Sequence, residues 1–465
     1  MSMDRYRKVI VLGLDGASPR VLEPMMDAGQ APAFARLRQC GTYRRLATTT
    51  PSQSPVAWST AATGCSPGQH GVFDFLRRDP KTYAPALSIL RVNPRNLARR
   101  RSAMFLPVRH GSPFWRVASD AGVPATVIRW PLTLPPEAVE GRMLAGLGVP
   151  DLRGSLGRYT FYTTGDGLPG ADDPKGDVVL LAGDGGAFHT HILGPEGSRD
   201  APMDIAVDRA ARSATITVQG ADHHVAERAW SERVRVEFPL RLRRPVTAQC
   251  RFYLKAAEPH LELYLSPLEA DPSAPAFVLS HPDGYAAQLA LAIGGYHTLG
   301  MPEDTHALCD GALDPEGFLS LCSTVMDERE RMLWHELDRF ERGCLACVFD
   351  TSDRVQHVFW DADAAHRHVI PAMYRRLDAI LGRLLARLDD RTLLVVLSDH
   401  GFAPFRRAVH LNSWLVHAGY MALEGSAKES DGLFHHVAWR DTTAYAVGFS
   451  SLFLNRRRRE GKGIV

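Results

Sequence analysis

The stretch Val9-Ile10-Val11-Leu12-Gly13-Leu14-Asp15-Gly16 decides the fold, because a short apolar run stops abruptly at a carboxylate and a glycine. Such runs, when they alternate with helical patterns, are typical of buried parallel strands in an α/β sheet. Two further apolar runs, at 345–349 and 393–397, are followed by Asp353 and Asp399. Ligands of these sheets bind at the carboxyl ends of the strands, so we expect the three carboxylates to meet at one edge.

The composition is that of an ordinary globular chain. Its 465 residues are 45% apolar and 23% charged, enough for one large domain with an insertion or for two domains. The formal charge of +2 argues against a nucleic-acid polymer or a membrane surface as a partner. No apolar stretch is long enough to span a membrane or to form a signal-peptide core, so the expected location is cytoplasmic. Seven cysteines, an odd number in a long chain, favour reduced thiols.

The pattern along the chain predicts three portions. Residues 1–154 read as the first part of an α/β core, with a helical pattern at 19–40 and a strand at 125–129. Residues 155–325 contain alternating, turn-punctuated segments, which predict a β-rich antiparallel insertion or cap. Residues 326–465 resume the α/β core. They end in four arginines and a short segment without a closing element, so we expect a solvated tail and a core that is incomplete at its C-terminus.

Two of the three carboxylates are accompanied by a histidine. Asp353 and His357 are four positions apart, on one face of a predicted helix, where they could share a cation or make a simple surface hydrogen bond. Asp399 and His400 follow a strand, an arrangement that suits either a ligand pair or an Asx turn. The Asp15-Gly16 turn has the same two interpretations.

Ser54 is the candidate nucleophile. It precedes Pro55 at the start of a short predicted helix, so its simplest role is that of an N-cap. A helix N-terminus also offers free N–H groups and a positive dipole end, which favour a phosphate group and a serine alkoxide. A cation held by Asp15, Asp399 and His400 that also touched Ser54 Oγ would deprotonate this hydroxyl near neutral pH.

Four segments, in this order, resemble the alkaline phosphatase superfamily and, within it, the type I phosphodiesterase/nucleotide pyrophosphatase branch. They are Gly13-Leu14-Asp15-Gly16, Thr50-Pro51-Ser52-Gln53-Ser54-Pro55-Val56-Ala57-Trp58 with the glycine-rich stretch up to Gly71, Thr351-Ser352-Asp353-Arg354-Val355-Gln356-His357, and Ser398-Asp399-His400-Gly401-Phe402.

The resemblance implies a mostly parallel sheet sandwiched by helices and a two-metal site for phosphoryl transfer. It places Asp15, Ser54, Asp399 and His400 at one metal ion, with Ser54 in the nucleophile position. It places Asp353 and His357 at the other ion. Mixed Asp and His ligands favour Zn²⁺, or else Mn²⁺, over Mg²⁺, which prefers oxygen ligands.

The chain departs from this family pattern in three ways. The family takes a further metal-ligating histidine from near the C-terminus, and His410, His435 and His436 all lack the matching context. Ala57 stands where an asparagine often donates to the phosphoryl oxygen, so another donor is expected, such as a backbone N–H at the helix start. The residues after Cys65 lack the arginine of a formylglycine signal, which disfavours the sulfatase branch.

The sequence therefore predicts a metal-dependent hydrolase of phosphoric esters, a phosphodiesterase or nucleotide pyrophosphatase with a small phosphorylated substrate. Ser54 would attack phosphorus, and water would then hydrolyse the phosphoseryl intermediate. The alternatives are a phosphomonoesterase or phosphomutase on the same core, a metal- or phosphate-binding protein without turnover, and clusters with a purely structural role.

Overall fold

The centre of the molecule is a six-stranded sheet with the strand order β18-β5-β4-β19-β1-β20. The computed structural model describes residues 7–92, 104–168, 173–183, 186–240, 245–430, 432–449 and 451–465. Five strands run parallel, and β18 alone pairs antiparallel, so the predicted mostly parallel sheet is confirmed. The strands are β1 (Lys8–Leu14), β4 (Ala125–Ile128), β5 (Gly141–Leu144), β18 (Ser280–His281), β19 (Gly343–Phe349) and β20 (Thr392–Leu397).

Alternate residues of β1 face two different apolar layers, as the period of two in a strand requires. Ile10, Leu12 and Leu14 belong to the larger core, and Val11 packs against the smaller one. Gly13 lies against Trp58, and a Cβ at this glycine would come within 2.6 Å of the indole ring. The apolar run is therefore buried on both faces, and β19 and β20 flank its two edges.

Helices cover both faces of the sheet. The larger core contains buried side chains of α1 (Pro19–Asp27), α2 (Pro32–Cys40), α6 (Tyr285–Ile293), α8 (Pro315–Leu337), α9 (Thr351–Phe359) and α10 (Val369–Leu385). The smaller core receives Trp58 and Ala62 from α3 (Ser54–Thr63) and Trp115 from α5 (Phe114–Asp120). This three-layered arrangement is compatible with the expected fold.

Two predicted boundaries differ in the structure. The helical pattern at 19–40 is two helices, because Gly29 adopts a positive φ of 71° and Pro32 starts a new helix. Helix α8 begins at Pro315, where Asp314 caps it, and it ends at Leu337. It therefore crosses the boundary between residues 325 and 326 that the sequence pattern predicted.

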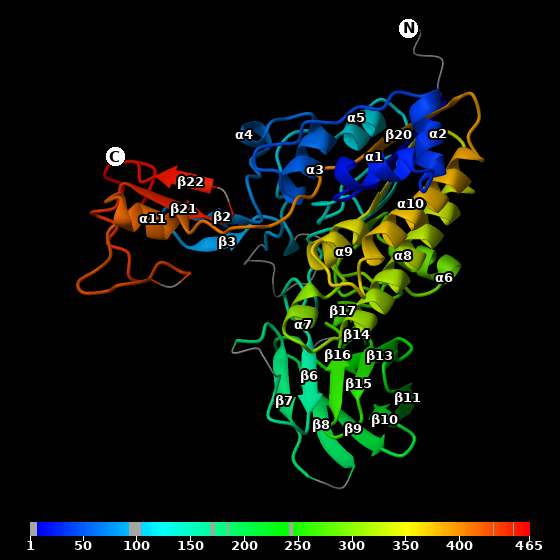
Figure 1. Cartoon of the computed structure of the whole chain (residues 1–465), viewed down its shortest axis with the longest axis vertical. Coiled ribbons are helices and arrows are strands. Elements are labelled where there is room, and N and C mark those ends of the chain that lie inside the picture. Colours follow the sequence, from blue (N-terminus) through cyan, green and yellow to red (C-terminus); the bar gives the residue numbers. More distant parts are fainter. Residues whose placement is uncertain are drawn as a thin grey trace.

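Residues between 160 and 270 form a separate β-rich part, seen below the main body in Figure 1. It has its own apolar core, and all its strand pairs are antiparallel except β6 with β7. Its strands are β6 (Thr160–Thr163), β7 (Asp177–Leu180), β8 (Ala187–Ile192), β9 (Ala201–Asp208), β10 (Ser213–Val218), β11 (Ala221–Ala226), β12 (Ala229–Trp230), β13 (Val234–Phe238), β14 (Val246–Cys250), β15 (Phe252–Ala256), β16 (Glu262–Leu265) and β17 (Glu269–Ala270), and helix α7 (Thr305–Cys309) lies beside them.

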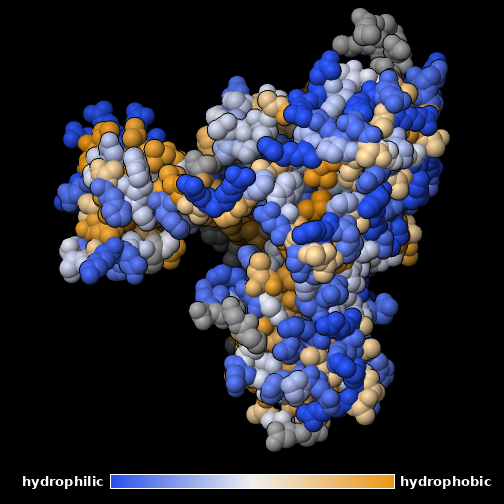
Figure 2. All heavy atoms as spheres, viewed as in Figure 1, coloured by the Kyte–Doolittle hydropathy of each residue, from blue (hydrophilic) through white to orange (hydrophobic). Residues whose placement is uncertain are grey.

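A small part containing the C-terminal residues lies to the left in Figure 1. Figure 2 shows apolar side chains gathered on this part, which exposes Trp414, Phe449 and Leu452. It consists of β2 (Leu76–Arg78), β3 (Pro85–Leu87), α11 (Leu411–His417), β21 (Ala444–Val447) and β22 (Ser451–Leu454), and the short α4 (Pro67–His70) precedes it in the chain.

The predicted solvated tail is only partly right: the four arginines are exposed, but the segment around them is folded. Glu460 is buried and accepts hydrogen bonds from Arg78 and from the Arg456 backbone, and Asn455 is buried as well. The backbone of Gly461 donates to Pro80. The basic run folds because the buried Glu460 carboxylate offsets part of its charge.

None of the helices in the described ranges combines the length and the apolar character that a membrane crossing requires. The seven cysteines are all free, and two of them, Cys344 and Cys347, are buried in β19.

Candidate active site

Three strands deliver carboxylates to one edge of the main sheet. Asp15 directly follows β1, and its N–H continues the ladder to the Phe349 carbonyl at 2.9 Å. Asp353 lies in the first turn of α9, which follows β19, and Asp399 comes two residues after β20. The Gly16 N–H donates to Asp399 Oδ1 at 3.0 Å and joins residues 383 positions apart. The prediction that the three segments come together at one edge of the sheet is confirmed.

Ser54 lies inside this cluster. Its Oγ is 3.2 Å from Asp15 Oδ1 and 3.0 Å from His400 Nε2, and the residue is only 5% exposed. The predicted N-cap role is wrong: Gln53 is the N-cap, and Ser54 is the first residue of α3. The hydroxyl is therefore not used to cap the helix and points at the acidic cluster.

The backbone at the start of α3 offers one free donor. The N–H groups of Val56 and Ala57 both donate to the Gln53 carbonyl at 2.9 Å, and Pro55 has no N–H. The Ser54 N–H makes no hydrogen bond to any residue in the described ranges. This amide could supply the donor that Ala57 does not.

Asp15, Asp399 and His400 form a group that could hold a metal ion. One ligand atom from each lies within 4.8 Å of the others. His400 Nδ1 is 3.0 Å from the Gly401 carbonyl, which can only accept, so Nδ1 carries a proton and Nε2 is the ring nitrogen available to a metal ion. His400 Nε2 lies 3.0 Å from Ser54 Oγ and 3.3 Å from Asp399 Oδ2.

Asp353 and His357 adjoin this group. Asp353 Oδ1 is 3.4 Å from His357 Nε2 on the same face of α9, and it is also 3.6 Å from His400 Nε2. His357 is 58% exposed at its side chain, whereas Asp353 is almost fully buried. The Phe402 ring packs against both imidazoles. The two predicted ligand sets therefore share one pocket.

The carboxylates of this pocket have shifted pKa values. Burial raises the pKa of Asp15 well above its ordinary value, and the nearby Asp399 and Asp353 raise it further. Burial also raises the pKa of Asp399. Burial would raise the pKa of Asp353 too, but the adjacent Arg354 guanidinium, with help from His357, brings it below its usual value. Such perturbed groups in one cluster are a common mark of a functional site.

Two buried oxygens show that the pocket fits a cation. Asp353 Oδ1 and Asp399 Oδ2 are inaccessible to solvent, yet neither has a hydrogen-bond donor among the described residues. A buried carboxylate oxygen without a partner is costly unless a cation or a proton satisfies it. Mixed Asp and His donors suit Zn²⁺ or Mn²⁺ better than Mg²⁺.

Several residues of the pocket carry roles that the sequence did not reveal. Trp58, which is buried in the smaller core, also donates from Nε1 to Asp15 Oδ2 at 3.0 Å. Gln356 Nε2 donates to the Gly16 carbonyl, and Ser352 Oγ donates to the Asp15 carbonyl. Arg354 donates to Asp353 Oδ2. Of these residues, only Arg354 could have been predicted from the sequence, because it is a cation directly beside a candidate ligand.

The other histidines considered as ligands lie elsewhere. His410 immediately precedes α11, and His435 and His436 come after that helix in the chain. Within the described ranges, Asp15, Asp399 and His400 form the one group with metal-ligand spacing, and it includes none of these three histidines.

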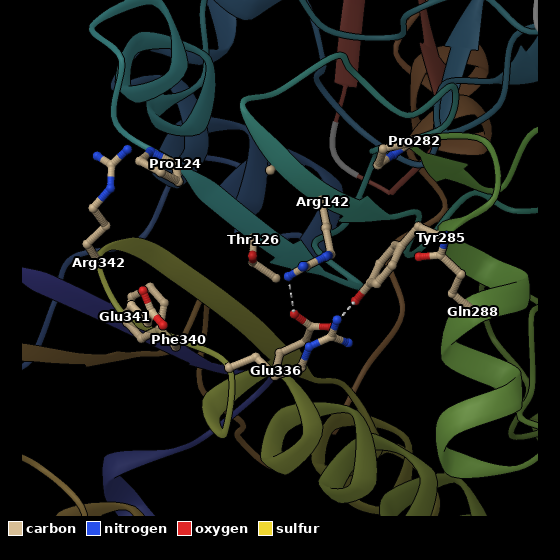
Figure 3. A pocket seen from close by; sticks show the side chains of 12 residues that line it. Pro124, Thr126, Arg142, Pro282, Tyr285, Gln288, Glu336, Phe340, Glu341 and Arg342 are labelled. Carbon is tan, nitrogen blue, oxygen red and sulfur yellow. Dashed lines mark hydrogen bonds and ion pairs between the residues drawn. The ribbon is translucent and has the colours of Figure 1, made fainter.

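A second cavity lies at the opposite edge of the sheet, where β4 and β5 begin (Figure 3). Its volume is about 470 Å³. The buried Glu336 carboxylate in it is already satisfied, because Arg142 and Tyr285 donate to it at 3.0 and 3.1 Å. This cavity shares no residue with the carboxylate pocket.

An α/β sheet that brings a serine hydroxyl, carboxylates and imidazoles together at its carboxyl edge has the architecture of a phosphoric-ester hydrolase of the alkaline phosphatase superfamily. A family model confirms this: the model of type I phosphodiesterase / nucleotide pyrophosphatase matches residues 9–452, and the chain belongs to that family. The family comprises hydrolases of phosphoric ester bonds that act on small phosphodiester substrates, and it is generally metal-dependent. No curated protein matches the chain.

Proposed function

We propose that the protein is a metal-dependent phosphodiesterase or nucleotide pyrophosphatase that works through a phosphoseryl intermediate at a two-metal site. The observation that carries the proposal is the position of Ser54 Oγ, within 3.2 Å of both Asp15 Oδ1 and His400 Nε2. A hydroxyl that is buried among two ligand-type groups at the start of a helix is placed for nucleophilic attack.

Asp15, Ser54, Asp399 and His400 would hold one ion, and Asp353 and His357 the other. The proposed ions are Zn²⁺, with Mn²⁺ as the alternative. When bound, they would lower the pKa of the Ser54 hydroxyl and stabilise the charge on the phosphoryl oxygens.

Other residues of the chain would orient the ligands and bind the phosphoryl group. Trp58 and Ser54 hold the two oxygens of Asp15, which fixes the orientation of this carboxylate. The Gly401 carbonyl holds His400 in the tautomer that leaves Nε2 free. The free Ser54 N–H is placed to donate to a phosphoryl oxygen in place of the family's asparagine.

We also propose that residues 1–154 and 326–465 form the catalytic core and that residues 155–325 form a cap that shapes substrate choice. The separate apolar core of the β-rich strands supports a distinct insertion. Within this range, strand β18 and helix α6 belong to the main sheet and its apolar layer, so the cap role would fall to the β-rich strands between 160 and 270. We place the protein in the cytoplasm, which the free cysteines support.

The test compares Ser54→Ala with Ser52→Ala, an exposed neighbour outside the pocket. Hydrolysis of bis(p-nitrophenyl) phosphate by Ser54→Ala should fall by more than about 10³-fold, because the nucleophile is lost. Bound metal, measured by elemental analysis, should remain close to that of the wild type. Retained turnover would remove Ser54 from the nucleophile role. Faster hydrolysis of p-nitrophenyl phosphate than of the diester would favour the phosphomonoesterase alternative.

A further inference from the structure

Arg354 is the cation closest to the proposed ligands. It follows Asp353 on α9, its side chain is only 11% exposed, and its Nη1 lies 2.7 Å from Asp353 Oδ2. No other carboxylate oxygen in the described ranges lies within 4 Å of its guanidinium. It nevertheless interacts electrostatically with Asp15, Glu303 and Asp350 as well as with Asp353.

The two oxygens of Asp353 have different surroundings. Oδ2 accepts the hydrogen bond from Arg354, whereas Oδ1 is buried without a donor and lies between the Nε2 atoms of His357 and His400. A carboxylate group is planar and rigid, so a bond that fixes Oδ2 also fixes the direction in which Oδ1 points. Charge-assisted bonds from arginine are among the stronger and more directional hydrogen bonds in proteins.

We propose that Arg354 is a positioning residue that occupies Asp353 Oδ2 and thereby presents Oδ1 alone to the cation shared with His357. This inference rests on the proposed function and adds a residue role and a ligand geometry to it. Partners that orient a metal ligand commonly change metal affinity 10- to 100-fold when they are removed.

A single hydrogen bond joins the two side chains, so lysine can replace arginine in this role. Lysine keeps the positive charge and can reach one carboxylate oxygen, although it lacks the planar fork. We therefore expect Arg354→Lys to keep metal affinity within a few-fold of the wild type. Arg354→Ala, which frees Oδ2 and leaves the buried carboxylate unpaired, should lower the affinity of the weaker metal site about 10- to 100-fold.

The experiment titrates metal-free protein with Co²⁺ alone and records the visible absorption, which reports both affinity and coordination number. The wild type, Arg354→Lys, Arg354→Ala and the exposed control Arg375→Ala are compared. The expected result is a lower affinity and a changed spectrum for Arg354→Ala only. In kinetics with the aryl diester, that variant should lose kcat, with KM within about threefold and with partial recovery at excess metal.

Three outcomes would overturn the inference. Unchanged Co²⁺ titrations for Arg354→Ala would show that Asp353 needs no positioning. A raised KM with unchanged metal affinity would make Arg354 a substrate contact instead. Loss of metal affinity in Arg354→Lys equal to that in Arg354→Ala would show that a single bond to Oδ2 is not what matters. Failure of the wild type to bind Co²⁺ would contradict the proposed function itself, and the two failures are therefore distinguishable.

Discussion

The buried carboxylates at the edge of the main sheet differ in their surroundings from one in the β-rich part. At the edge of the main sheet, Asp353 and Asp399 each keep one buried oxygen without a donor. In the β-rich part, Glu269 of β17 is equally buried, but His297 Nδ1 lies 2.6 Å from Oε1 and the Thr298 N–H donates to Oε2 at 2.6 Å. The Gln249 amide and the Leu299 N–H lie near Oε2 as well.

The pKa values of Asp15 and Asp399 shift in the opposite direction to that of Glu269. Burial raises the pKa of Asp15 and Asp399. Burial would also raise the pKa of Glu269, but His297 and its hydrogen bonds outweigh it and lower the pKa to about 2. Glu269 is satisfied by protein donors, whereas Asp353 and Asp399 each keep one oxygen without a donor among the described residues. The difference predicts that equivalent substitutions in the two regions will have opposite effects on stability.

The largest expected effect is that of Asp399→Ala. Removing this carboxylate should lower both bound Zn²⁺ and hydrolysis of bis(p-nitrophenyl) phosphate, the latter by more than about 10³-fold. Asp361→Ala, an exposed aspartate beyond α9, is the matched control and should change neither. Elemental analysis and initial rates measure both quantities. An unchanged metal content in Asp399→Ala would show that Asp399 is not a ligand.

The next effect is a loss of stability in Glu269→Gln. A pKa lowered from 4.5 to about 2 corresponds to about 3 kcal/mol of stability when the group is ionised. This contribution is fully present above the unfolded pKa of 4.5 and is lost as the pH falls through the folded pKa of about 2. Urea unfolding at a series of pH values should therefore show a wild-type advantage over Glu269→Gln that is largest near neutral pH and vanishes toward pH 2. Glu258→Gln, an exposed control, should show no such trend, and a pH-independent advantage would contradict the proposed origin.

The smallest expected effect is a gain of stability, in contrast to the loss expected for Glu269→Gln. In the presence of a chelator, Asp399→Asn should raise the free energy of unfolding by about 1 to 2 kcal/mol, because it removes a buried charge whose ionised form is disfavoured. The penalty in the wild type is present above the folded pKa of Asp399 and is absent below the unfolded one, so the advantage of the variant should shrink as the pH falls.

With saturating Zn²⁺, the wild type should instead be more stable than Asp399→Asn. A ligand at 100 times its Kd stabilises the native state by about 2.7 kcal/mol, and only the wild type retains the complete ligand set. Urea unfolding with and without Zn²⁺ measures the difference. Destabilisation by Asp399→Asn in metal-free protein would place Asp399 with Glu269, as a carboxylate that supports the fold.

The elements that form the site were largely predictable from the sequence, because strands buried on both faces leave continuous apolar runs. The runs at 9–14, 345–349 and 393–397 all lie in observed strands. The helix that carries Asp353 and His357 and the short helix after Gln53 were also predicted correctly.

The remaining features depend on one unusual backbone conformation and on contacts between distant residues. The break between α1 and α2 depends on the local conformation of Gly29, which a helical apolar period hides. The buried ion pair of Arg78 with Glu460 joins residues 382 positions apart, so a local rule reads the basic run as a tail. The hydrogen bond from the Trp58 indole to Asp15 also joins distant residues. A tryptophan that only packs in the core and one that also donates a hydrogen bond give the same apolar position in the sequence, so the sequence does not predict this bond.

The hydrogen bond from Gly16 to Asp399 spans 383 residues, and it has a consequence for synthesis on the ribosome. At about 5 to 20 residues per second, Asp399 leaves the exit tunnel some 20 to 80 s after Asp15. Strand β1 lies between β19 and β20 in the finished sheet, and it has neither neighbour until β19, at residues 343–349, has been translated. Open, apolar strand edges invite wrong pairing. We therefore expect the nascent chain to depend most on chaperones before β19 and β20 have been translated.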